Sequence, residues 1–132
     1  MGIKGFKDLL VWQKAKDLSV TLYKVTGTGA LGHDYGLRDQ IRRAAVSIAS
    51  NIAEGDERNT DKESVRFFFI AKGSLAELRT QLHIAYDVGY LAENKFHDLD
   101  HNCMELGKMI GKLIQVRQSA INNRQGAKGD GQ

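Results

Sequence analysis

The stretch "FHDLDHNCMELGKMIGKL", residues 96–113, carries the plainest folding signal in the chain. Its apolar side chains are Phe96, Leu99, Cys103, Leu106, Ile110 and Leu113. They follow one another at intervals of three or four residues, which is the heptad spacing of a helix packed along one face. Glu105, Lys108 and Lys112 fall away from that face. The pattern predicts an amphipathic helix over residues 94–117.

Segments on the N-terminal side of this helix repeat the same periodicity. The spacing of their apolar residues predicts helices over residues 9–25, 37–54 and 59–88. Thr60 and Glu63 are placed to form a capping box at the start of the third helix. Gly55 and Gly89 are placed to end the second and third helices. The glycine-rich residues 27–36 predict a flexible connection between the first two helices.

Four helices with short connections predict an all-α fold, an antiparallel up-down-up-down four-helix bundle. We expect a single domain over residues 1–117. Residues 118–132 have little apolar content and three glycines, which predicts a disordered C-terminal tail. The alternative architecture is a three-helix core with a loosely docked first helix.

Composition describes an ordinary globular chain of 132 residues, with 27% charged and 42% hydrophobic residues and no proline. The absence of proline favours long helices, because proline breaks helix interiors. A single cysteine excludes an intramolecular disulfide and fits a reducing compartment. We see no signal peptide and no apolar run long enough to span a membrane. We therefore expect a cytoplasmic protein without a membrane partner.

Three of the four predicted helices carry apolar side chains on two faces. Monomers rarely expose large contiguous apolar patches, so these second faces predict self-association. Small residues in the second helix fit close packing on both of its sides. The alternative is that an imperfect bundle simply leaves a few apolar side chains outside. The predicted oligomer interface comprises Trp12, Tyr23, Val46, Ala49, Ala53, Val65 and Phe69.

Motifs that carry chemistry are scarce, so we predict no catalytic residue, no cofactor and no enzyme activity. No serine lies in a G-x-S-x-G elbow, and the glycine-rich residues 27–36 lack the G-K-[ST] of a phosphate loop. His97 and His101 have the i, i+4 spacing that allows two histidines to share a metal ion. A solvated start of the fourth helix explains the same pair, and we predict no metal site.

Basic residues on the second and third helices suggest a surface for phosphate groups. The candidate nucleic-acid-binding residues are Arg38, Arg42, Arg43, Arg66, Lys72 and Arg79. The net charge of +3 is mildly basic and does not identify a nucleic-acid binder by itself. The alternative is an ordinary solvated face, since acidic residues such as Asp39 and Glu63 stand near these cations.

Three stretches together resemble one bacterial family. They are "FKDLLVWQKAKDLSVTLYKVT" at residues 6–26, "YGLRDQIRRAAVSIASNIAEG" at residues 35–55 and "RFFFIAKGSLAELRTQLHIAYDVGYL" at residues 66–91. The chain is similar, over residues 6–113, to the four-helix-bundle proteins encoded within intervening sequences of bacterial ribosomal RNA genes. The accessory variability proteins of diversity-generating retroelements are similar too. Ala49 stands where family members commonly have proline.

The resemblance implies a four-helix bundle that assembles as a ring-like homopentamer. For the accessory variability proteins it also implies binding to nucleic acid and to a reverse transcriptase. From residues and resemblance together, we predict a non-enzymatic homo-oligomer, a pentamer, that binds RNA or DNA through basic surfaces. The alternative function is a structural or protein-interaction scaffold with no nucleic-acid role.

Overall fold

The computed structural model describes residues 5–130, with side chains described for residues 5–126. Within this part of the chain every regular element is helical. The elements are η1 (Gly5–Asp8), α1 (Leu10–Val25), α2 (Gly29–His33), α3 (Tyr35–Asp56), α4 (Asp61–Asp87) and α5 (Glu93–Asp130). None of the described helices is long and apolar enough to cross a membrane.

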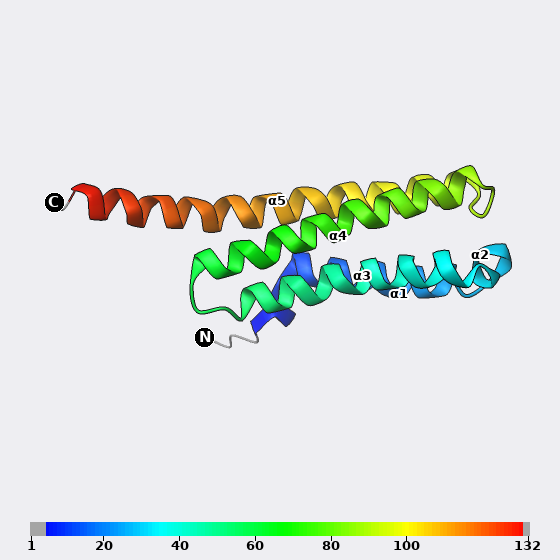
Figure 1. Cartoon of the computed structure of the whole chain (residues 1–132), viewed down its shortest axis with the longest axis horizontal. Helices are drawn as coiled ribbons and strands as arrows, with labels where there is room; N and C mark the ends of the chain where they lie inside the picture. Colours follow the sequence, from blue (N-terminus) through cyan, green and yellow to red (C-terminus); the bar gives the residue numbers. More distant parts are fainter. Residues whose placement is uncertain (1–4, 131–132) are drawn as a thin grey trace.

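The four long helices form the predicted bundle (Figure 1). Helix α1 contacts α3 and α5, and α4 contacts the same two helices from the other side. Short connections join successive helices, so the chain runs up and down four times. The turn that holds α2 and the turn between α4 and α5 lie at the same end of the bundle, where the Tyr90 hydroxyl donates a 3.0 Å hydrogen bond to Asp34.

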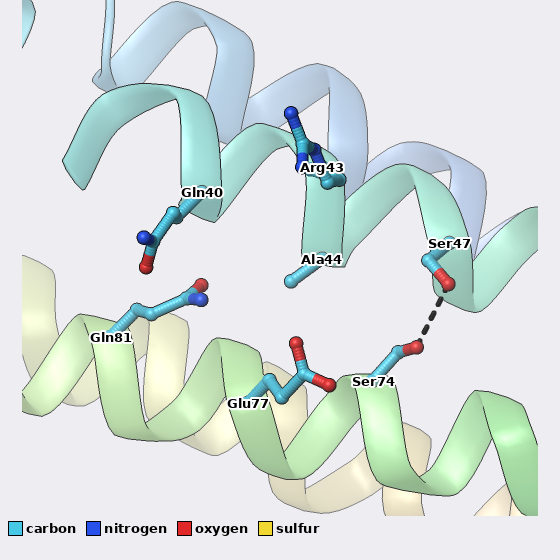
Figure 2. Close-up of a pocket in the computed structure, with 7 residues that line it drawn as sticks. All are labelled: Gln40, Arg43, Ala44, Ser47, Ser74, Glu77 and Gln81. Atoms are coloured by element: carbon cyan, nitrogen blue, oxygen red, sulfur yellow. Dashed lines mark hydrogen bonds between the residues drawn. The ribbon is translucent and has the colours of Figure 1, made fainter. Parts of the chain in front are cut away.

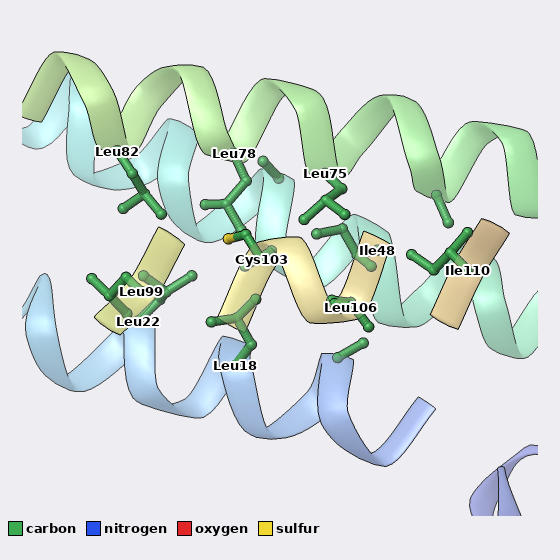
Figure 3. Packing of buried hydrophobic residues seen from close by; sticks show 14 of the residues in the cluster. Leu18, Leu22, Ile48, Leu75, Leu78, Leu82, Leu99, Cys103, Leu106 and Ile110 are labelled. Carbon is green, nitrogen blue, oxygen red and sulfur yellow. The ribbon is translucent and has the colours of Figure 1, made fainter. Parts of the chain in front are cut away.

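Heptad-spaced side chains from all four helices fill the core (Figure 3). Leu18 and Leu22 of α1 face Leu99 and Leu106 of α5, as Figure 3 shows. Helix α4 contributes a heptad-spaced seam of six buried residues: Ser64, Ala71, Leu75, Leu78, Leu82 and Ala85. The seam of α5 is buried from Phe96 to Ile110, and Ile114 then takes the buried place expected of Leu113.

Capping explains where α4 begins and ends. The Thr60 hydroxyl accepts a 3.2 Å hydrogen bond from the Glu63 amide, as the capping box predicts. Gly89 follows the helix with a φ of +87°, the left-handed conformation that favours glycine after a helix end. Helix α3 instead begins before Leu37, because the Asp34 side chain accepts a 3.1 Å hydrogen bond from the Leu37 amide.

Two connections differ from the sequence prediction. Residues 27–36 were expected to be a flexible connection, but they contain α2, which Leu31 anchors with a side chain only 1% exposed. Gly55 was expected to cap α3, but it lies inside the helix and is buried. A Cβ atom built on Gly55 would lie 2.5 Å from Cε1 of Phe68, so the absent side chain lets α3 and α4 approach closely.

The C-terminal segment also differs from the prediction. Residues 118–130, expected as a disordered tail, continue α5 as a helix past the start of α4 (Figure 1), and residues 131–132 lie outside the described residues. Arg117 donates a 3.2 Å hydrogen bond to Asp61 of α4, and Arg124 pairs with the same carboxylate. These ion pairs, together with the partly buried Ile121, attach the extension to the bundle.

Candidate self-association surfaces

An apolar groove runs along the outside of the bundle between α1 and α3. Its lining comes from η1, α1 and α3: Phe6, Trp12, Lys16, Ser19, Val46, Ala49, Ser50 and Ala53. We call this surface the α1/α3 groove. The rings of Phe6 and Trp12 meet edge to face, with centroids 5.0 Å apart, and close one side of it. Small residues of α3 form its floor, which explains why the second helix carries so little bulk.

Charged residues stand at both ends of the α1/α3 groove. Near Phe6 the hollow continues past Ala53 to Glu54 and Glu57. At the opposite end Arg42 lies over the Tyr23 ring, 4.5 Å from its centroid. The groove is therefore acidic at the end of α3 that leads to α4 and basic at the end near α2.

A second apolar surface lies on α4 and faces away from the core. We call it the α4 stripe: Phe69, Gly73, Ala76, Thr80 and Ile84, all of them exposed. Phe69 is 52% exposed and Ile84 is 48% exposed. Residues spaced by three and four positions share one helical face, so the stripe is continuous. Ile70 and Val88 widen it with further exposed apolar side chains.

Most of the predicted interface residues fall on these two surfaces. Trp12, Val46, Ala49 and Ala53 line the α1/α3 groove together, and Tyr23 follows at its basic end. Phe69 begins the α4 stripe. The sequence prediction missed Phe6, because it precedes the first predicted helix and belongs to no periodic pattern.

Val65 was assigned to the predicted interface, and that assignment is wrong. Val65 is only 7% exposed and belongs to the hydrophobic core. It lies one helical turn after Asp61, whose carboxylate pairs with Arg117 of α5. Helix α5 therefore runs over the first turns of α4 and covers this face, which the shorter helix expected from the sequence would have left open.

Three of the six candidate nucleic-acid-binding residues are engaged inside the chain. Arg42 donates hydrogen bonds to the buried Thr26 hydroxyl at 2.8 Å and to the Tyr23 carbonyl at 3.2 Å, which ties α3 to the end of α1. Arg38 pairs with Asp39 at 2.9 Å. Arg79 donates a 3.0 Å hydrogen bond to Asp100 of α5, and this bond raises the pKa of Arg79.

The other three candidates, Arg43, Arg66 and Lys72, are exposed. Arg43 lines a polar cleft between α3 and α4, with its side chain directed away from α4 (Figure 2). The hydroxyl oxygens of Ser47 and Ser74 lie 2.8 Å apart further along the same cleft. Lys72 lies two helical turns before Arg79, on the side of α4 that faces α5. The candidate cations therefore spread over several faces of the monomer.

Histidine and cysteine side chains do not assemble a metal site in the described part of the chain, where no three potential ligands gather. His97 pairs with Glu93 at 3.6 Å, and His101 lines a separate hollow between α1 and α5. Cys103 is completely buried, and this burial raises its thiol pKa to about 12. The thiol therefore behaves as a small apolar group of the core.

Comparison with known proteins places the fold and the family. No curated protein matches the chain significantly. A crystal structure of a protein of unknown function from the S23 ribosomal protein family of Bacteroides thetaiotaomicron is similar, with a TM-score of 0.74 and 19% sequence identity. The match covers 80% of this chain and 98% of that protein. The family described as 23S rRNA-intervening sequence protein matches residues 7–112, and the chain belongs to that family.

Proposed function

We propose that this chain is a non-enzymatic protein that assembles with copies of itself. One observation carries the proposal: the α1/α3 groove and the α4 stripe remain exposed although the bundle core is already closed. Water in contact with such apolar surface raises the free energy, and association removes that contact. The family resemblance implies five subunits in the assembly.

The absence of an enzymatic role is part of the same proposal. Catalytic cysteines act as exposed thiolates, whereas Cys103 is buried with a raised pKa. Among the described histidines, His97 stands beside Glu93 and His83 lies 3.9 Å from Asp100, with no serine in either pair. These observations favour a scaffold over a hydrolase. A lone buried thiol also fits the cytoplasmic location that we propose.

The test of self-assembly is the mass of the wild-type protein in solution. Light scattering at micromolar concentration should return a multiple of the 14.7 kDa subunit mass, near five times that value for a pentamer. A mass of one subunit across the concentration range would overturn the proposal.

A second candidate function is nucleic-acid binding by the assembled protein. The exposure of Arg43 and Lys72 favours it, because assembly would repeat these cations, and the net charge of +3, once per subunit. Phosphate contacts of this kind are largely independent of sequence and weaken steeply as salt rises. A reverse transcriptase is a further partner that the resemblance to accessory variability proteins implies.

Binding of structured RNA and duplex DNA should be measured at several salt concentrations. Replacing Arg43 and Lys72 with Glu should lower affinity for all sequences alike and flatten the salt slope by about one unit per lost phosphate contact. These positions are better probes than Arg42, whose replacement would also disturb α1. If wild-type protein retains no nucleic acid at ~50 mM salt, where such contacts are strong, the scaffold function stands alone.

A further inference from the structure

We propose that the α4 stripe of one subunit packs into the α1/α3 groove of the next, in a head-to-tail contact with the two bundles side by side and pointing the same way. This inference rests on the proposed self-assembly and names its two surfaces. The groove is a hollow lined by aromatic and small residues, whereas the stripe presents the exposed Phe69 beside a shallow hollow at Gly73, Ala76, Thr80 and Ile84. The large side chain of the stripe can therefore enter the groove.

The difference between the two surfaces decides the kind of contact. A symmetric dimer buries one shared face on each subunit, so it could pair groove with stripe only if both lay on that single face. The groove opens between α1 and α3, whereas the stripe lies on α4, which packs against α3 and not against α1. A head-to-tail contact covers both surfaces on every subunit once the chain of contacts closes into a ring. The exposed apolar surface therefore favours the head-to-tail arrangement.

Contacts within one subunit fix the heights of residues along the bundle. Ser47 of α3 is level with Ser74 of α4, and Gln40 faces Gln81 (Figure 2). Both helices rise about 1.5 Å per residue in opposite directions, so Ala53 is level with Phe69 to within about a residue. By the same count Val46 is level with the interval from Gly73 to Ala76. Rotation about an axis parallel to the bundle keeps every residue at its own height, so these levels also hold between neighbouring subunits.

Side-chain sizes match in this register. Phe69 of the stripe comes level with Ala53 and Ser50, the small residues in the floor of the groove. Val46 projects from α3 where the stripe has the small residues Gly73 and Ala76. A Cβ atom built on Gly73 would meet nothing within 4 Å in the single subunit, so this space stays open until a neighbour fills it. Each large side chain therefore meets a small one.

Charges match in the same register. At the Phe69 end of the stripe, Lys62 and Arg66 come level with Glu57 at the acidic end of the groove, next to Glu54, which pairs with Arg58 of its own chain. Rim charges of opposite sign steer association and fix register. Arg66 would then serve the subunit contact and not a nucleic-acid surface.

Cross-linking between two singly labelled proteins tests the contact. In a Cys103→Ala background, one protein carries Glu57→Cys and the other carries Arg66→Cys, and each is treated with a short bifunctional maleimide alone and after mixing and exchange of subunits. The mixture should give a covalent dimer, whereas each protein alone should give none. A matched control that mixes Glu57→Cys with Lys108→Cys, on the outer face of α5, should give none either.

Each other outcome contradicts a different claim. A wild-type mass of one subunit overturns self-assembly and this contact with it. An oligomeric mass with no cross-link in the Glu57→Cys and Arg66→Cys mixture, or with equal cross-linking of either protein alone, overturns the head-to-tail register and leaves self-assembly standing.

Charge exchange gives an independent readout without new cysteines. Arg66→Glu should raise the concentration at which half the protein is assembled by about tenfold, the scale of about 1.4 kcal/mol. Adding Glu57→Arg to the same chain restores opposite charges across every contact and should recover most of that loss. If the double variant assembles no better than Arg66→Glu while both remain folded by circular dichroism, the proposed pairing of Arg66 with Glu57 is contradicted.

Discussion

Helices α4 and α5 pack side by side, yet their outer faces differ. Both bury a heptad seam in the same core. The outer face of α5 is charged, and Glu105 pairs there with Lys108 at 3.5 Å. The outer face of α4 carries the stripe from Phe69 to Ile84. Packing of the bundle explains the pattern of α5 apart from the exposed Met104 and Val116, and it leaves the stripe of α4 unexplained. The proposed subunit contact would cover that stripe.

The largest effect on the free energy of unfolding is expected in the hydrophobic core that α4 and α5 share. Phe68 is fully buried, and Phe68→Ala should lower the free energy of unfolding by about 3–5 kcal/mol, because it removes apolar contacts and leaves a cavity. Urea unfolding followed by circular dichroism measures this change. Val116→Ala, on the exposed side of α5, is the control and should stay within about 0.5 kcal/mol of wild type.

A smaller loss is expected where α3 approaches α4. Gly55→Ala should cost about 1–3 kcal/mol, because the new methyl group would overlap the buried Phe68 ring. The double variant with Phe68→Leu should lose less than the two separate changes added together, since the smaller side chain makes room. Strict additivity in urea unfolding would show that the close approach of these two residues is not what makes glycine necessary.

The buried face of α5 predicts a pH effect. Burial raises the pKa of Cys103 from 9.0 to about 12, so above pH 9 the unfolded chain loses this proton while the folded chain keeps it. Stability should therefore fall as pH rises from about 9 towards 12, by about 1.4 kcal/mol at pH 10 relative to pH 8. Cys103→Ala should not show this loss of stability between pH 8 and pH 10. If urea unfolding finds that the free energy of unfolding falls equally with pH in both proteins, the prediction is contradicted.

Two glycines with open space at Cβ, the exposed Gly73 and the half-buried Gly111, give the smallest effects on folding and compare α4 with α5 directly. A Cβ atom on Gly73 of α4 or Gly111 of α5 would meet nothing within 4 Å in one subunit. Each change to Ala should raise the free energy of unfolding of the monomer by about 0.5–1 kcal/mol through helix propensity. Gly73→Ala should weaken assembly, because a neighbour's Val46 needs that space, whereas Gly111→Ala should leave assembly unchanged. Equal assembly of both variants in light scattering would place the contact elsewhere.

Sequence periodicity predicted most of the fold because heptad seams are local patterns. The seam from Phe96 to Ile110 and the capping by Thr60 both lie within a single helix, where spacing and propensity suffice. Leu31 and Gly55 depend on a distant partner, so the pattern in their own segment misled the prediction.

The candidate site was predicted only where it lies on one helical face. Trp12, Ala49 and Phe69 were found from their opposition to a seam. Val65 lies on the same side of its helix as Phe69 but is buried under α5. A helical-wheel diagram of one helix does not show which neighbouring helix covers a residue. The hydrogen bond from Arg42 to Thr26 is likewise a contact that no single-helix pattern contains. The charge of Arg42 suggested a side chain free to bind phosphate, but the structure shows it bound to the end of α1.

The central claim is that the outer face of α4 is covered by another subunit and the outer face of α5 is not. Phe69→Asp on α4 and Met104→Asp on α5 test it as a pair, because the two native side chains are 52% and 45% exposed in the single subunit. A charge trapped in a subunit contact is strongly unfavourable, whereas a charge facing water is not. Light scattering at micromolar concentration should find Phe69→Asp dissociated and helical, and Met104→Asp with the oligomeric mass of wild type. Equal masses for the two variants, or a Phe69→Asp chain that loses its helicity, would contradict the claim.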